Sequence, residues 1–121
     1  MRNILVVDDE KRPRILMSKI IQKKLKQNLN KDLIKVDDVS TEKDAIQKLR
    51  NNEYDVVIAD LYMFGDKNSG IKVLNEAKKL YNETAKRILI SAYPEPVENN
   101  GNFFISKLEQ NSYDELIAIA A

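Results

Sequence analysis

Five polar residues stand at the ends of short apolar runs, and their side chains are of the kinds that handle phosphate or a hard cation. They are Asp8, Asp9, Asp60, Ser91 and Lys107. Three carboxylates gathered in one pocket repel one another, by an illustrative ~4 kcal/mol per pair at 4 Å and an effective dielectric of about 20. Such a cluster is tolerated when a cation lies among the oxygens or when some carboxyls keep their protons. All-oxygen ligands favour Mg²⁺ or a similar hard cation.

Taken as a set, these residues indicate phosphoryl transfer onto a carboxylate. An aspartate can act as a nucleophile and form an acyl phosphate, while the protein positions the group and neutralises its charge. Asp60 is the best candidate nucleophile because it ends the central apolar run, and Asp8 and Asp9 are better placed as metal ligands. Lys107 adds a fixed positive charge, and Ser91 adds a hydroxyl that can donate to an anionic oxygen. Each residue alone has an ordinary structural explanation, such as capping a helix or starting a turn.

The elements that must position these residues alternate between strands and helices. Strands are predicted at residues 4–7, 33–36, 55–60, 87–91 and 103–107, and helices at about 13–29, 41–49, 69–80 and 112–121. Most of the strand runs are continuously apolar, which is typical of parallel strands buried on both faces; the mixed run at 33–36 indicates an edge strand. Thr41 with Asp44 resembles a capping box. The alternation predicts right-handed βαβ units in one α/β domain over residues 1–121. In such a sheet the carboxyl ends of the strands meet at one edge, where ligands bind.

One interval breaks this alternation. Residues 92–102 contain two prolines, three asparagines and one glycine, which is incompatible with a regular helix of normal length. The fourth crossover helix is therefore predicted to be shortened or absent. The chain also stops within its last predicted helix, so the sequence leaves open whether an effector domain follows residue 121.

Composition excludes several kinds of site. The chain has no cysteine and no histidine, so it has no disulfide or thiolate site and lacks the commonest general base. Its formal net charge of +1 gives no general argument for nucleic-acid binding. Basic residues crowd residues 11–31, as a solvated helix face or as a docking surface for an acidic partner. No apolar run is long enough to span a membrane and no signal-peptide pattern precedes the first strand, so we expect a cytoplasmic protein.

The ordered set of motifs resembles the receiver domains of response regulators in two-component signal transduction. The matching residues are Val6–Glu10, Asp60–Met63, Gly70, Ile90–Ala92, and Lys107 three residues after Phe104. The resemblance implies a flavodoxin-like, doubly wound five-stranded parallel sheet in the order 2-1-3-4-5. It further implies a phosphoacceptor that assists its own phosphoryl transfer and dephosphorylation rather than an enzyme. The phosphodonor would be a histidine kinase, a phosphotransfer protein or a small molecule.

The resemblance also implies a role for each residue of the set. Asp60 would be phosphorylated and would contribute to Mg²⁺ binding. Asp9 would bind Mg²⁺ directly and Asp8 mainly through water, with the backbone carbonyl of Tyr62 as a further ligand. Lys107 would pair with Asp60 or with the phosphoryl group.

A two-state switch is implied as well, biased by the local change in charge. Ser91 would move toward the phosphoryl oxygens, and Phe104 would turn inward behind it. Phe104 lacks the hydroxyl of the tyrosine that is commoner in the family, so its part in the switch would depend on packing alone.

Three further positions depart from the family pattern. Phe64 replaces a proline and precedes a slightly long loop, and Leu108 replaces the proline that usually follows the lysine. A cis bond before a residue other than proline costs about 3 kcal/mol, so we expect a trans bond after Lys107. The irregular segment 94–102 falls on the face that family members use for dimerisation and output, so we expect an atypical output surface.

Two tyrosines stand where family members flank the phosphoryl group. Tyr62 is two residues after Asp60, and Tyr93 is two residues after Ser91. Their rings are predicted either to screen the attacking water and lengthen the phosphorylated lifetime, or to be ordinary surface side chains.

Two alternative functions fit parts of the sequence. The first is a pseudo-receiver adaptor that no longer cycles phosphate, which the irregular fourth crossover favours and the complete acidic set opposes. The second is a phosphohydrolase with an aspartate nucleophile, which usually requires a second acid where Tyr62 stands. A nucleotide-binding domain is disfavoured because neither glycine-rich phosphate motif is present.

Overall fold

Five parallel strands form one sheet, in a computed structural model that describes residues 2–28, 34–63, 65–66, 68–81, 84–92, 103–107 and 112–121. The strands are β1 (Arg2–Val7), β2 (Ile34–Val39), β3 (Val56–Asp60), β4 (Lys86–Ser91) and β5 (Phe103–Ser106). Their order is β2-β1-β3-β4-β5, and each neighbouring pair is parallel. The predicted strand order and the predicted edge position of β2 are confirmed.

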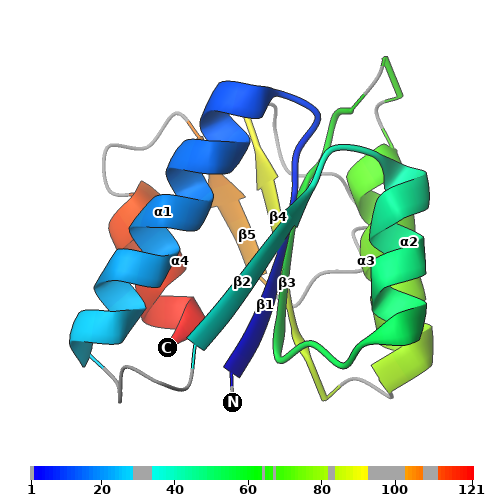
Figure 1. The fold of residues 1–121 in the computed structure, drawn as a ribbon. Helices are drawn as coiled ribbons and strands as arrows, with labels where there is room; N and C mark the ends of the chain where they lie inside the picture. Colours follow the sequence, from blue (N-terminus) through cyan, green and yellow to red (C-terminus); the bar gives the residue numbers. More distant parts are fainter. Residues whose placement is uncertain are drawn as a thin grey trace.

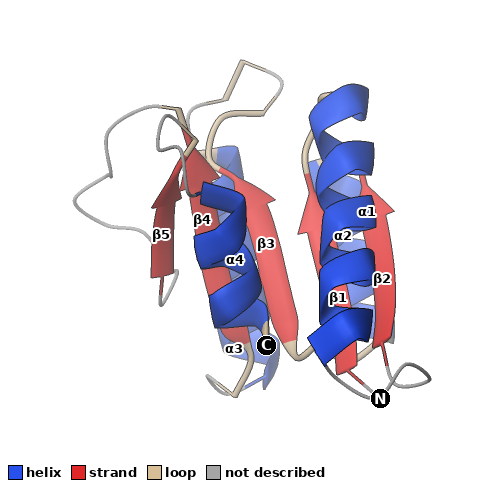
Figure 2. Ribbon diagram, turned by 90° about the vertical axis from the view of Figure 1, so that its left-hand side faces the viewer, coloured by secondary structure: helices blue, strands red, loops and turns tan. Residues whose placement is uncertain are grey.

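The described segments contain four helices, which cover the two faces of the sheet in pairs. They are α1 (Lys11–Asn28), α2 (Glu42–Asn51), α3 (Ser69–Tyr81) and α4 (Ser112–Ala120). α1 and α4 pack on one face, and α2 and α3 pack on the other (Figure 1). Figure 2 looks from the side of α1 and α4, with the sheet behind them and α2 and α3 beyond it. This is the doubly wound arrangement that the alternation predicted.

Side chains alternate between two cores along each buried strand. In β1, Ile4 and Val6 pack with α1 and α4, whereas Leu5 and Val7 pack with α2 and α3. All four are at most 1% exposed. Because both faces of β1 are covered, its run is continuously apolar, as the sequence indicated.

Several element boundaries differ from the prediction, by at most three residues. β2 begins at Ile34 and continues to Val39, three residues beyond the predicted end, because its two aspartates still pair with β1 in register. The hydroxyl of Tyr54 donates to one of them, Asp37, at 2.7 Å. α1 begins two residues before Pro13, since a proline in the first turn needs no intrahelical donor. β5 ends at Ser106, one residue earlier than predicted.

The predicted start of the second helix is confirmed by its cap. Thr41 is extended, with φ −130°, and its hydroxyl accepts a hydrogen bond from the amide of Asp44 at 3.0 Å. This bond satisfies one of the free amides of the first turn.

Several predictions concern positions outside the described residues. These positions are Phe64, Tyr93, the segment 94–102 and Leu108. The prediction of a shortened or absent fourth crossover helix therefore falls outside the described part of the chain. Among the helices that the structure describes, none has the length and apolar character needed to cross a membrane.

Candidate functional site

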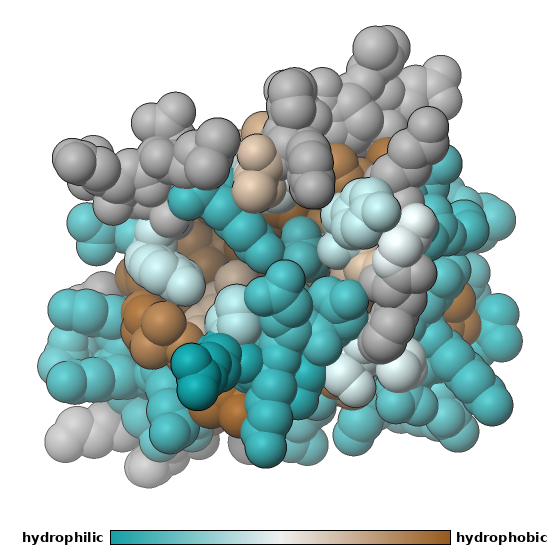
Figure 3. All heavy atoms as spheres, turned by 90° about the horizontal axis from the view of Figure 1, so that it is seen from above, coloured by the Kyte–Doolittle hydropathy of each residue, from teal (hydrophilic) through white to brown (hydrophobic). Residues whose placement is uncertain are grey.

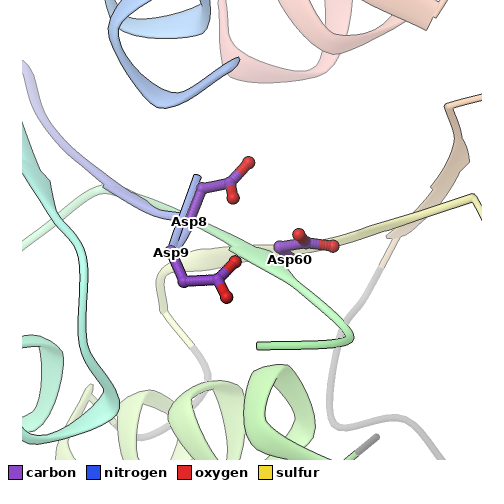
Figure 4. Close-up of side chains that lie close together, drawn as sticks. All are labelled: Asp8, Asp9 and Asp60. Atoms are coloured by element: carbon purple, nitrogen blue, oxygen red, sulfur yellow. The ribbon is translucent and has the colours of Figure 1, made fainter. Parts of the chain in front are cut away.

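Three carboxylates converge at the carboxyl edge of the sheet. Asp60 is the last residue of β3, and Asp8 and Asp9 follow the adjacent strand β1. Val7 of β1 pairs in register with Ala59 of β3, so the two strands reach the carboxyl edge of the sheet together. One carboxylate oxygen from each aspartate lies within 4.8 Å of the others, and Figure 4 shows the three groups around a common space.

Lys107 joins this cluster from the other side of β4. It follows β5, and its backbone amide donates to the carbonyl of Ser91 at 2.8 Å, which continues the β4–β5 ladder by one residue. Its Nζ lies 3.1 Å from Oδ2 of Asp60 and 3.6 Å from Oδ2 of Asp8. A single ammonium group therefore lies against two of the three carboxylates.

The carboxylate of Asp8 has one oxygen that accepts no hydrogen bond from the described part of the chain. Asp8 is 1% exposed, and its Oδ1 accepts a bond from the amide of Glu10 at 3.0 Å. Its Oδ2 is buried and has no hydrogen-bond donor among the described residues; the ammonium of Lys107 lies 3.6 Å away. A buried acceptor without a donor costs about 1–3 kcal/mol, and more when it is charged. A metal ion that coordinated this oxygen would remove that cost, and a set of donors made only of oxygen atoms fits Mg²⁺.

Burial and the neighbouring charges shift the pKa values of the two central groups of the site. Burial raises the pKa of Asp60 to about 6; Lys107 opposes this rise, and Asp8 and Asp9 add to it. Burial by itself lowers the pKa of Lys107, but the nearby Asp60 and Asp8 raise it above its usual value overall. At neutral pH the site therefore holds an ionised Asp60 beside a protonated lysine.

The two residues of the predicted switch lie on neighbouring strands. Ser91 ends β4 and is fully buried. Phe104 is half-buried on β5, in register with Leu89, and packs against the core beneath α2 and α3. The side chain of Tyr62, which follows Asp60 by two residues, is 42% exposed. The structure thus places Ser91 beside the site and leaves much of the Tyr62 ring open to solvent.

The structure explains why residue 70 is a glycine, which the sequence alone did not. It is the second residue of α3, and its amide donates to the carbonyl of Leu61 at 3.1 Å. A Cβ at this position would collide with the carbonyl oxygen of Asp60 and lie 2.8 Å from its carbonyl carbon. Only glycine permits this approach, which brings α3 against the backbone of the candidate nucleophile.

Arg14 is a contributor to the site that sequence reasoning missed. Its guanidinium bonds both to Asp38 on β2 and to the backbone carbonyl of Asp8. In the sequence it is one of many basic residues in the segment 11–31, and nothing in that pattern separates it from the others.

A cavity of about 340 Å³ with a mixed polar and apolar lining opens next to Lys107. It lies between α1, α4 and the last two strands, and its lining includes Pro13, Met17, Ile105 and Leu116. Figure 3 looks down on this edge of the molecule and shows recessed apolar surface between polar side chains. The acidic cluster is therefore bordered by apolar surface on the side of α1 and α4.

Comparisons with known proteins agree with the fold. The family model of the response regulator receiver domain matches residues 4–103. A CheY-like receiver domain protein from Methanospirillum hungatei is 18% identical, with a TM-score of 0.76 over 98% of this chain and 89% of that one. No curated protein sequence matches the chain.

Response regulator TrrA from Thermotoga maritima is similar over the whole length. In its complex with Mg²⁺–BeF it is 27% identical, with a TM-score of 0.67 and all of both chains covered. In its complex with the histidine kinase ThkA it is 26% identical, with a TM-score of 0.71 over 99% of this chain and 98% of that one.

The doubly wound parallel sheet of this chain has the CheY-like fold. Because the family model covers most of the chain, the protein belongs to the receiver domains of two-component response regulators.

Proposed function

We propose that this receiver domain accepts a phosphoryl group on Asp60 in a Mg²⁺-dependent reaction. The observation that carries the proposal is the environment of one atom. Oδ2 of Asp60 lies 3.1 Å from Nζ of Lys107, within a cluster of three converging carboxylates. A carboxylate that is nearly buried yet ionised at neutral pH, with a fixed cation at hydrogen-bond distance, is suited to act as a nucleophile toward phosphorus.

Asp8, Asp9 and Asp60, with the backbone carbonyl of Tyr62, are the groups that would hold Mg²⁺. The unsatisfied Oδ2 of Asp8 supports this assignment, because it is a buried anionic oxygen without a hydrogen-bond donor in the described residues. When bound, Mg²⁺ neutralises negative charge on the carboxylates and on the phosphoryl oxygens.

The residues of the chain then carry out one displacement. A carboxylate oxygen of Asp60 forms a bond to the phosphorus of the donor as the bond from phosphorus to the donor's leaving atom breaks. The leaving atom keeps the electron pair; a leaving imidazole then takes a proton from solvent, whereas a leaving carboxylate stays ionised. Lys107 stays protonated throughout and offsets the charge of the acyl phosphate.

Membership of the family supports a proposal for the donor and for the response. TrrA is a response regulator seen in complex with a histidine kinase, and we propose a histidine kinase or a phosphotransfer protein as the donor for this chain. We also propose that the buried hydroxyl of Ser91 turns toward the phosphoryl oxygens. Phe104 would then repack toward α3, changing the surface that a partner contacts.

The test is incubation with Mg²⁺ and a small acyl phosphate, followed by intact mass measurement. We expect one phosphoryl adduct, which disappears in Asp60→Asn and when Mg²⁺ is chelated. Asp66→Asn is the matched control, because it removes an exposed carboxylate that pairs with Lys72 instead.

Two other outcomes would overturn the proposal. Absence of an adduct with both a small donor and a cognate kinase would favour the pseudo-receiver adaptor. Catalytic turnover of a phosphomonoester would favour the phosphohydrolase.

A further inference from the structure

Arg14 differs from the other basic residues of α1 in what its side chain does. The others are exposed apart from Lys26, which is partly buried near the end of the helix, whereas the Arg14 side chain in the first turn is only 15% exposed. Burial of a guanidinium requires several hydrogen-bond acceptors, and arginine is suited to this because its donors form a rigid fork. The partners of Arg14 therefore identify its role.

Two nitrogens of this fork bond to two different elements. Nε donates to Oδ1 of Asp38 on β2 at 2.9 Å, which also forms an ion pair. Nη1 donates to the backbone carbonyl of Asp8 at 3.2 Å. Arg14 thus connects the first turn of α1 to the residue that follows β1, and its ion pair with Asp38 holds the guanidinium against β2.

The carbonyl of Asp8 belongs to the peptide unit that joins the two metal-site aspartates. The backbone of Asp8 is held at both ends. Its amide donates a hydrogen bond to the carbonyl of Val39 at 3.2 Å, and its carbonyl accepts the hydrogen bond from Arg14. Because the Cα of Asp9 is attached to the same planar unit, fixing that unit limits where the Asp9 carboxylate can point.

We propose that Arg14, held by Asp38, is a positioning pair for the Mg²⁺ site, acting through the backbone between Asp8 and Asp9. This inference rests on the proposed function, since it concerns the metal that the cluster would hold. Arg14 touches none of the reacting atoms. It orients two ligands before the metal arrives, as residues outside the coordination sphere do in other metal sites.

The experiment measures the Mg²⁺ dissociation constant of the full chain by calorimetric titration without any phosphodonor. Arg14→Gln should weaken Mg²⁺ binding by about tenfold. Arg14→Lys should recover part of this loss, because a lysine can reach Asp38 but lacks the planar fork. Asp38→Asn should weaken binding by a smaller factor, since the guanidinium loses its anchor.

The matched control is Arg50→Gln. Arg50 also bonds to a carboxylate through Nε, to Glu76 at 3.1 Å, but this pair links α2 to α3 and touches none of the three aspartates. The Mg²⁺ affinity of Arg50→Gln should equal that of the parent. The double variant Arg14→Gln/Asp38→Asn should bind no more weakly than Arg14→Gln, because Asp38 acts only through Arg14.

All titrations are made at a temperature at which circular dichroism shows every variant folded. A purely structural role would lower the melting temperature of the Mg²⁺-free protein without changing the dissociation constant. Parent-like Mg²⁺ affinity in Arg14→Gln overturns this inference alone and leaves the proposed function standing. If Arg14→Gln does not fold, parent-like affinity in both Arg14→Lys and Asp38→Asn overturns it. Absence of Mg²⁺ binding by the parent overturns both the inference and the proposed metal site.

Discussion

The carboxylate of Asp60 should destabilise the Mg²⁺-free domain, so that Asp60→Asn is more stable than the parent. The reason is electrostatic. Asp60 is 9% exposed and lies beside Asp8 and Asp9, so in the folded chain its ionised form has lost most of its hydration and is repelled by two neighbours. Lys107 offsets only part of this cost, because the pKa of Asp60 remains above its ordinary value. An asparagine has nearly the same shape and carries no charge.

The magnitude follows from the pKa shift. Folding moves the pKa of Asp60 from 3.8 to about 6, and each pKa unit corresponds to about 1.4 kcal/mol. This gives an upper limit of about 3 kcal/mol, and remaining solvent access lowers the expected gain to about 1–3 kcal/mol. For a chain of this length, 1 kcal/mol corresponds to about 4 °C in melting temperature. The variant should therefore melt about 4–12 °C above the parent.

The sign of the pH dependence is fixed by the same shift. Since the folded state has the higher pKa, it binds the Asp60 proton more tightly than the unfolded chain does. The stability that this proton contributes is fully present below the unfolded pKa and is lost as pH rises through about 6. The stability difference between Asp60→Asn and the parent should therefore be small near pH 4, grow between about pH 4 and 6, and be constant above about pH 7.

The assay is urea or thermal unfolding of both proteins in the presence of a chelator across this pH range. Asp66→Asn is the control: hydrogen bonds from Lys72 and Asn68 lower the pKa of that exposed carboxyl, so its loss should not stabilise the fold. Addition of Mg²⁺ should raise the stability of the parent and have little effect on Asp60→Asn. An Asn variant that is no more stable than the parent at neutral pH would refute the electrostatic account.

Three further substitutions test other features of the site. Gly70→Ala should destabilise the fold by about 1–3 kcal/mol in urea unfolding, because its Cβ would collide with the Asp60 backbone; an unchanged midpoint would show that α3 can shift freely. Lys107→Gln should raise the Asp60 pKa further and slow phosphorylation by an acyl phosphate about a hundredfold, followed by mass against time; a parent-like rate would remove Lys107 from the mechanism. Tyr62→Asn should speed dephosphorylation if the ring screens the attacking water, and an unchanged rate would leave Tyr62 as an ordinary surface residue.

Much of the fold could be predicted from the sequence because burial on both faces leaves a local pattern. The continuous apolar runs of β1, β3 and β4 are required by the two helical layers that cover them, and the Thr41 cap depends on residues three apart. The apolar pattern was weakest at β2, where the polar residues Asp37 and Asp38 interrupt it before the strand ends. Pairing with β1 keeps this part extended, and pairing between strands that are distant in the sequence leaves no local pattern.

The sequence by itself determined which residue types stand at the strand ends, and hence that an acidic cluster with a lysine was to be expected at one edge. Only the tertiary structure decided how these groups meet. Lys107 reaches Asp60 across an intervening strand, the Oδ2 of Asp8 is buried without a hydrogen-bond donor in the described residues, and Arg14 bonds to the carbonyl of Asp8. The physical reason is that periodicity records which side chains are buried, whereas distances between elements depend on how two covered faces pack together.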